Sequence, residues 1–353
     1  MKGSTMKMKL TGSVLILLLL WGWYATRSTS LVPSSIEEAG EVAPRDGGFT
    51  VENYDSNLNP HVYSYASPPK RIVAMWQNSI ETLLAFGAGN RIIAASGVPS
   101  DDVLSVSCVA AYRQIPIRSP RGLDVETLLM LEPDLIVGWL FDFVGRGNGQ
   151  GRSDFWEKRG TNIYMTTVNI NEYKAEHTLF DEIRFIRDMA VLAGRKEAAE
   201  QIEAEIEAAF HHPERGEPPL RVVVIGGMER GIHIYTPRTL PGDLLRRLGA
   251  EVLGKEIERV GEEEAISYEE LLVMDPDVIF IQNQRLGDEI PQEKLYRHPA
   301  LQGLKAVRNH RIYGVPFFMI RCPGIRILDG IRLFRHGRSE EHTSELQSLV
   351  DIS

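Results

Sequence analysis

The chain has 353 residues, of which 43% are hydrophobic and 25% are charged. This composition is typical of a globular protein, and the length allows about two domains of ordinary size. A formal net charge of -9, without a long run of Lys and Arg, argues against nucleic-acid binding. The two cysteines, Cys108 and Cys322, are too few for a disulfide framework. The cysteines lack the spacing of a zinc site, and so does the neighbouring pair His211 and His212. We therefore predict no metal and no cofactor.

Residues 1–35 have the features of a secretory signal. Three lysines precede an apolar run at residues 14–23, and small and polar residues follow it. The run is shorter than the roughly 20 apolar residues of a membrane span. We therefore predict export, to the periplasm or the outer face of the cytoplasmic membrane, with either a cleaved signal peptide or a retained N-terminal anchor. Residues 36–69 are predicted to be a linker and lead-in to the first folded unit.

Residues 70–175 are predicted to form an N-terminal α/β lobe, because short apolar strands alternate with amphipathic helices. The pattern predicts a strand at 71–75, a helix at 80–89 that ends on glycine, and another strand at 90–96. A helix, a Pro break and a buried strand then follow at 124–139. This alternation is typical of a parallel sheet.

Residues 176–212 are predicted to form a bridging helix, since apolar residues recur there at helical spacing. Gly194 is a possible break, so the segment is either one long helix or two shorter ones. Residues 219–337 then repeat the strand-first pattern and are predicted to form a C-terminal α/β lobe.

One unit of helix, proline and strand occurs in both lobes without a gap. Glu126 corresponds to Glu269, an offset of 143 residues. Under this offset four further positions match, namely Leu128 with Leu271, Pro133 with Pro276, Asp134 with Asp277, and Ile136 with Ile279. The repeat predicts a duplicated α/β architecture, with a strand-first unit and a parallel sheet in each half.

Residues 338–353 contain the sequence RSEEHTSELQS, which matches one reading frame of a short-read sequencing adapter over eleven residues. We predict that this tail derives from the adapter and that the C-terminal lobe is truncated.

The chain resembles the solute-binding proteins of ABC importers that take up iron–siderophore complexes, haem and cobalamin. Its markers include LDVETLLMLEPDLIVGW, TLPGDLLRRLGAEV, ISYEELLVMDPDVIFI and LKAVRNHRIYGVP, and the resemblance covers about residues 70–331. It implies a monomer of two Rossmann-like α/β lobes with parallel sheets, joined by one long, rigid backbone helix, with a metal chelate or corrinoid held between the lobes. It also implies delivery to the permease of an ABC importer, without catalysis. No lipid-anchor cysteine follows the apolar run.

Candidate ligand-binding residues follow the strands, because ligands bind at the carboxyl ends of strands in open α/β sheets. Aromatic rings with a few amide and guanidinium donors suit a bulky, often anionic chelate. The candidates are Trp76, Gln77, Asn78, Trp139, Phe141, Tyr235, Asn283, Phe317 and Arg321. The alternatives remain open: the tryptophans pack on a loop or core, Tyr235 is a core residue, and Arg321 forms a surface salt bridge.

Glu126 and Glu269 have two interpretations. As carboxylates at helix starts they interact favourably with the helix dipole. The resemblance implies instead that they dock with arginines of the permease. Asp124 and Ser267, just before these helices, are expected to be N-caps.

The sequence leaves two other functions open. One is a metallocluster or chelatase-type enzyme on a similar frame, for which Cys108, Cys322 and His233 are the only candidate ligands. The other is a ligand-sensing domain of a membrane receptor. The sequence contains no short hydrolase or zinc-protease motif.

Overall fold

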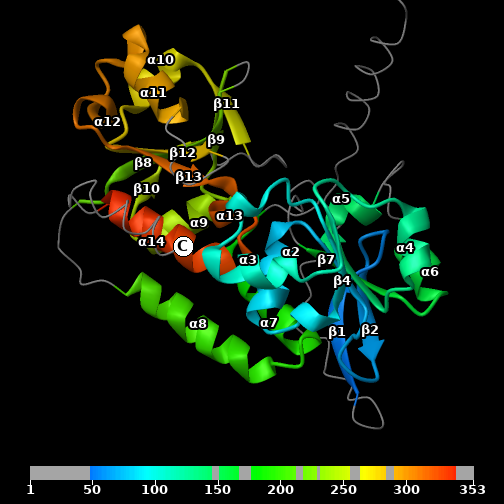
Figure 1. Cartoon of the computed structure of the whole chain (residues 1–353). Coiled ribbons are helices and arrows are strands. Elements are labelled where there is room, and N and C mark those ends of the chain that lie inside the picture. The colour runs from blue at the N-terminus through cyan, green and yellow to red at the C-terminus, as the bar shows by residue number, and fades with distance from the viewer. Residues whose placement is uncertain are drawn as a thin grey trace, which may run out of the picture.

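The computed structural model describes residues 48–144, 151–166, 176–211, 218–228, 231–254, 263–283 and 290–338. The predicted signal segment at 1–35 and the adapter-like residues 339–353 lie outside the described residues. Two α/β lobes and the helices that join them make up the described chain (Figure 1).

The N-terminal lobe is built on a parallel five-stranded sheet in the order β5-β4-β3-β6-β7. Its strands are β3 (Ile72–Met75), β4 (Ile92–Ser96), β5 (Ile117–Ser119), β6 (Leu135–Trp139) and β7 (Asn162–Thr166). Its helices are α2 (Gln77–Ala85), η1 (Gly89–Arg91), η2 (Asp101–Val103), α3 (Val106–Arg113), α4 (Val125–Leu131), α5 (Leu140–Phe143) and α6 (Ser153–Glu157). Every residue of β3 is buried, as expected for a strand that helices cover on both faces.

A β-hairpin occupies part of the segment that was predicted to be a linker. Strands β1 (Phe49–Tyr54) and β2 (Pro60–Tyr65) pair antiparallel. Asn53 ties the hairpin to β7, because its side-chain amide exchanges hydrogen bonds of 3.1 and 2.9 Å with the backbone of Met165. The linker prediction was therefore wrong for residues 49–65.

The bridge consists of two helices, not one. Helix α7 (Leu179–Leu192) ends before Gly194, and α8 (Lys196–Phe210) begins after it. Gly194 has a φ of 65°, a left-handed conformation that breaks the helix and that glycine adopts without strain. The resemblance implied a single long helix, and the structure corrects this.

The C-terminal lobe has a six-stranded sheet in the order β11-β9-β8-β12-β13, with β10 also pairing with β8. Its strands are β8 (Arg221–Gly227), β9 (Ile232–Tyr235), β10 (Glu251–Val252), β11 (Glu263–Ile266), β12 (Val278–Asn283) and β13 (Ile312–Pro316). Its helices are α9 (Leu240–Arg247), α10 (Tyr268–Met274), α11 (Ile290–Arg297), η4 (Pro299–Leu301), α12 (Lys305–Arg308), α13 (Phe317–Ile320), η5 (Gly324–Arg326) and α14 (Ile327–Arg338). Strands β9 and β11 run antiparallel to their neighbours, so this sheet is mixed and not wholly parallel as predicted.

The repeated sequence unit forms the same local structure in both lobes. Leu128 of α4 and Leu271 of α10 are completely buried. Each helix ends on a left-handed residue that is not glycine, Glu132 with φ 44° and Asp275 with φ 40°. Asp124 and Ser267 accept hydrogen bonds from the N–H groups of the first turns, which confirms both as N-caps.

In each lobe, the arginine at the start of the central strand forms hydrogen bonds with the repeated unit of helix, proline and strand. The Asp134 carboxylate accepts from the Arg71 N–H at 2.9 Å, and the Asp277 carboxylate accepts from the Arg221 N–H at 3.0 Å. The two guanidinium groups donate to the C-cap carbonyls of α4 and α10, at 3.1 and 3.4 Å respectively. The duplication therefore extends to individual hydrogen bonds.

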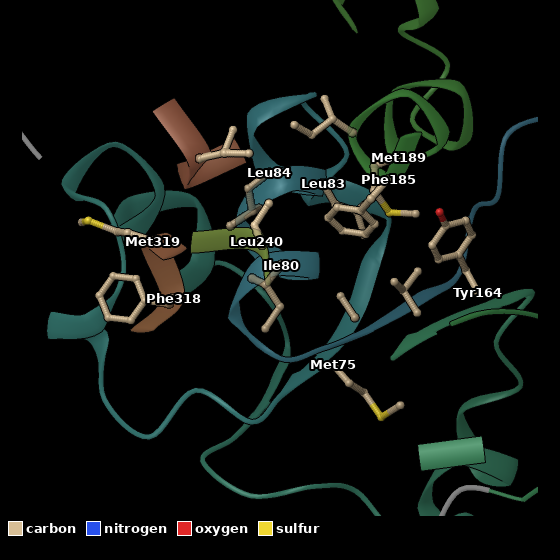
Figure 2. Close-up of a cluster of buried hydrophobic side chains, with 14 of the residues drawn as sticks. Met75, Ile80, Leu83, Leu84, Tyr164, Phe185, Met189, Leu240, Phe318 and Met319 are labelled. Atoms are coloured by element: carbon tan, nitrogen blue, oxygen red, sulfur yellow. The ribbon is translucent and has the colours of Figure 1, made fainter. Parts of the chain in front are cut away.

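The two lobes share one hydrophobic core. Figure 2 shows Met75, Ile80 and Leu83 of the N-terminal lobe in the same cluster as Leu240 and Phe318 of the C-terminal lobe. The other face of the C-terminal sheet has a separate core. Because shared apolar packing joins the lobes, the strand ends that carry candidate site residues belong to one connected body.

Candidate functional site

Three aromatic rings meet at the carboxyl ends of β3 and β6. The Trp76 and Trp139 rings stack with their centroids 4.5 Å apart and an interplanar angle of 22°. Phe141 approaches both edge-on, with centroid distances of 5.7 and 5.5 Å. The Phe141 side chain is 44% exposed and the two indoles are half-buried. We call these three residues the aromatic cluster; it brings together three of the predicted binding residues.

Hydrogen bonds fix both indole rings. The Trp76 Nε1–H donates to Asp142 Oδ2 at 2.7 Å, and the Trp139 Nε1–H donates to Asn78 Oδ1 at 3.0 Å. Asp142 Oδ2 also accepts from the backbone N–H of Trp139 at 2.8 Å. Since both indole donors are satisfied inside the protein, the rings are held in place before any ligand arrives.

Asp142 is a buried carboxylate at the centre of this arrangement. Burial raises its pKa to about 6, while the hydrogen bonds from Trp76 and Trp139 act in the opposite direction. The sequence analysis placed Asp142 in the loop after the strand but gave it no role. The available signal was its position three residues after Trp139, at the third residue of a helix, where a carboxylate can accept from the N-cap N–H.

The backbone of Trp76 is unusual, with a φ of 69°. Such a conformation costs free energy in a non-glycine residue and is often found at functional sites. Its ring lies against Gly97, where an added Cβ atom would come within 2.7 Å of the indole. A glycine at position 97, in the loop after β4, is therefore needed for the observed position of the ring.

The other two N-terminal candidates lie behind the aromatic cluster. Asn78 is 3% exposed and holds Trp139, so it positions a ring. Gln77 is 8% exposed, and its amide donates to Glu81 Oε2 at 2.8 Å and to the Val103 carbonyl at 2.7 Å. The structure thus places Gln77 and Asn78 in supporting positions.

The C-terminal candidates separate into two groups. Tyr235 and Asn283 are only 1% and 4% exposed, and the Tyr235 hydroxyl donates to Gln282 Oε1 at 2.5 Å. Tyr235 is therefore a core residue, which was the alternative to a binding role. Phe317 and Arg321 are half-buried; Phe317 begins α13 directly after the carboxyl end of β13, and Arg321 follows the last residue of α13.

The segment η5 of the C-terminal lobe forms hydrogen bonds with the bridge helix α7 and with α2 of the N-terminal lobe. The Gly324 N–H donates to Glu182 Oε2 at 2.9 Å, and the Ile325 N–H donates to Thr82 Oγ1 at 3.1 Å. Arg326 pairs with Glu81 at 3.3 Å, and both side chains are buried. Because Glu81 and Thr82 are on α2, these bonds connect the C-terminal lobe to the helix that also carries Asn78.

Burial raises the pKa of Glu81, and Arg326 is the main influence in the opposite direction. The sequence analysis did not identify this buried ion pair, because its members are 245 residues apart.

Neither Cys108 nor Cys322 is in a disulfide, and both are buried. Among the described residues, no group of three or more His, Cys, Asp or Glu side chains has a metal-binding arrangement. Within that same part of the chain, none of the helices combines the length and the apolar character that crossing a membrane requires.

Comparison with known structures supports the architecture. A periplasmic binding protein from Veillonella parvula is 30% identical, with a TM-score of 0.73, and the match covers 82% of this chain and 91% of that one. An ABC-type Fe3+-hydroxamate transport protein from Saccharomonospora viridis is 19% identical over 82% of this chain and 98% of its own, with a TM-score of 0.63. A periplasmic haem-binding protein from Vibrio cholerae is 18% identical over 76% and 99%, with a TM-score of 0.58.

A comparison with curated proteins gave no match. The family model described as periplasmic binding protein matches residues 72–317, which run from the start of β3 in the first sheet to the end of β13 in the second. With this match and the relative from Veillonella parvula, the chain belongs to the periplasmic binding protein family.

Proposed function

We propose that this protein captures an iron chelate, a siderophore complex or haem, outside the cytoplasmic membrane and delivers it to an ABC importer. The aromatic cluster is the observation that carries the proposal. Its rings are stacked, hydrogen-bonded and partly exposed at the carboxyl ends of β3 and β6. Ligands bind at this edge of open α/β sheets.

The residues of both lobes suit the chemistry of an iron chelate. Phe141 and the two indoles offer an apolar face to a macrocycle or to catechol rings. Arg321 follows β13 and α13, and its guanidinium suits a carboxylate, propionate or catecholate oxygen. The Fe3+-hydroxamate transport protein and the haem-binding protein that share this fold also support this ligand class.

Tryptophan fluorescence titration of the purified protein tests the proposal. The probes are a ferric hydroxamate, a ferric catecholate, haem and cobalamin. Since Trp76 and Trp139 form the proposed contact face, one of the iron chelates should quench the emission saturably at one ligand per protein. Binding of cobalamin alone would replace the iron chelate with a corrinoid. Absence of saturable binding by all four probes would overturn capture.

We also propose that Glu126 and Glu269 dock the loaded protein on the permease. Both carboxylates are exposed, and they are in equivalent first turns of α4 and α10 in different lobes. Equivalent carboxylates on two lobes fit a partner with two basic contact points.

Charge reversal separates docking from capture. Glu126→Lys and Glu269→Lys should lower uptake of the iron chelate by at least tenfold in cells that depend on this protein. Affinity for the chelate should stay within about twofold, because neither residue is near the aromatic cluster in sequence or on the same elements. Glu200→Lys is the control, since Glu200 is also an exposed helical glutamate but is on α8. Normal uptake by both reversal variants would contradict docking through these residues.

A further inference from the structure

The repeated helices α4 and α10 each expose a large apolar side chain. Met130 is 86% exposed and Val273 is 85% exposed. Among the described residues these two are the most exposed of the large hydrophobic side chains. They are also equivalent under the same offset that relates Glu126 to Glu269. A single exposed apolar side chain is common on protein surfaces, but these two occupy equivalent positions of a repeated unit.

Each apolar side chain is next to its docking glutamate. Glu126 and Met130 are four residues apart on α4, as are Glu269 and Val273 on α10, and residues at this spacing are neighbours on one helix face. Leu128 and Leu271, between them in sequence, are fully buried on the opposite face. Both helices therefore present a carboxylate and an apolar side chain together on the outer face.

The orientation of both helices is fixed. Each ends on a left-handed non-glycine residue, and the arginine at the start of the central strand of its lobe donates to that residue's carbonyl. A left-handed residue ends many helices, and here the arginine hydrogen bond holds that ending in the same geometry on both lobes. The two faces are thus preorganised for a partner.

We propose that Met130 and Val273 are apolar anchors, each of which inserts into an apolar pocket of one subunit of a two-subunit permease. A basic side chain at the rim of each pocket meets Glu126 or Glu269. The proposal rests on the proposed function and adds a second chemical component to docking. An apolar contact stabilises the complex once formed, whereas the carboxylates set its orientation and association rate.

Charge on the two faces favours this partner over a second copy of the chain. A symmetric dimer through either face would bring Glu126 against Glu126, or Glu126 against Glu269, and so place like charges together. The net charge of -9 adds to the repulsion. Figure 1 shows α4 and α10 on different lobes, at outer ends of the molecule. A permease with two subunits, each carrying one apolar pocket with a basic side chain at its rim, would therefore be complementary to the two faces.

The test uses nearly isosteric polar substitutions in the full chain. Met130→Gln and Val273→Thr are made singly and together, with Val62→Thr as the matched control. Val62 is 48% exposed on β2, away from both helices in the chain. Affinity is measured for the cognate permease–ATPase complex in nanodiscs of zwitterionic lipid, and for empty nanodiscs. Binding of the four chelate and corrinoid probes is measured in parallel by tryptophan fluorescence.

Each docking substitution should weaken permease binding about tenfold and the double substitution about a hundredfold, with chelate affinity and the Val62→Thr control unchanged. Wild-type affinity in the double variant, while Glu126→Lys and Glu269→Lys lose binding, would overturn the apolar anchors but leave capture and charge docking intact. Equal binding of the wild type to empty nanodiscs, or concentration-dependent dimers that the substitutions abolish, would also overturn the proposal. Absence of chelate binding by the wild type would instead refute the proposed function itself.

Discussion

Asp142 is a buried side chain that fixes the positions of Trp76 and Trp139 in the aromatic cluster. Its carboxylate accepts hydrogen bonds from the Trp76 indole and the Trp139 backbone, although burial raises its pKa to about 6. In the unfolded chain the same group titrates near 3.8. Between about pH 4 and pH 6 the folded protein thus retains a proton that the unfolded chain has lost.

This difference predicts how stability changes with pH. The contribution of Asp142 to the free energy of unfolding falls as pH rises through this window, by about 3 kcal/mol at most. Asp142→Asn removes the titration. Relative to this variant, the wild type should therefore lose stability between pH 4 and pH 7 in urea unfolding experiments. Parallel pH dependences of the two proteins would show that Asp142 titrates normally.

Gly97 permits the position of Trp76, and its replacement should displace the ring. Gly97→Ala adds a Cβ atom that would be 2.7 Å from the indole, at a φ of 82°. Affinity for the iron chelate should fall by at least tenfold in the fluorescence titration. Gly160→Ala is the control, because Gly160 has a φ of 80° but no atom within 4 Å of the added Cβ. If both variants bind the chelate equally well, the ring position does not determine affinity.

Sequence reasoning predicted where Trp76, Trp139 and Phe141 are in the chain, because strand ends in α/β sheets can be recognised from hydrophobic patterns. It did not predict that Asp142 links the Trp76 indole to the Trp139 backbone, since these groups meet only after β3 and β6 are neighbours. The burial of Tyr235 was also undecided, because an aromatic residue at a strand end suits a core and a binding site equally.

At the scale of elements, η5 is the point where the C-terminal lobe enters the N-terminal one. Gly324 has a φ of 51°, and an added Cβ would be 2.5 Å from Thr82 Oγ1 and 3.0 Å from the Phe185 ring. Gly324→Ala should lower the free energy of unfolding by about 1–3 kcal/mol through strain and overpacking. Gly303→Ala meets no atom within 4 Å and is the control.

Thermal unfolding measures the effect of these alanine substitutions. Gly324→Ala should lower Tm by several degrees, while Gly303→Ala changes it little. Equal Tm values for Gly324→Ala and the wild type would mean that η5 adjusts without cost.

Three features of the fold could not be decided from the sequence, each for its own physical reason. The β1–β2 hairpin has a short alternating pattern interrupted by Asn and Pro, and its stability comes from contacts with β7 more than 100 residues away. The antiparallel strands β9 and β11 are each four residues long, too short to show their direction in sequence. The break at Gly194 was one of two open alternatives, because an isolated glycine is tolerated inside some helices.

At the scale of the whole molecule, the two lobes are joined by a shared hydrophobic core and by the hydrogen bonds of η5, as well as by the chain itself. Met75 and Ile80 pack in the same cluster as Leu240 and Phe318, as Figure 2 shows. The duplicated lobes were predictable from the repeat at Glu126 and Glu269. Their packing against one another was not, because long-range contacts between Glu81 and Arg326 or within the shared core leave no periodic pattern in the chain.

The position of iron in a complex tests the central claim of capture between the lobes. Crystals grown with the iron chelate that binds in titration would be measured at the iron absorption edge. The account predicts one anomalous peak beside Trp139 and Phe141, on the side of Phe317 and Arg321 of the C-terminal lobe. A peak on the outer face of either lobe, or ordered chelate away from the aromatic cluster, would contradict it.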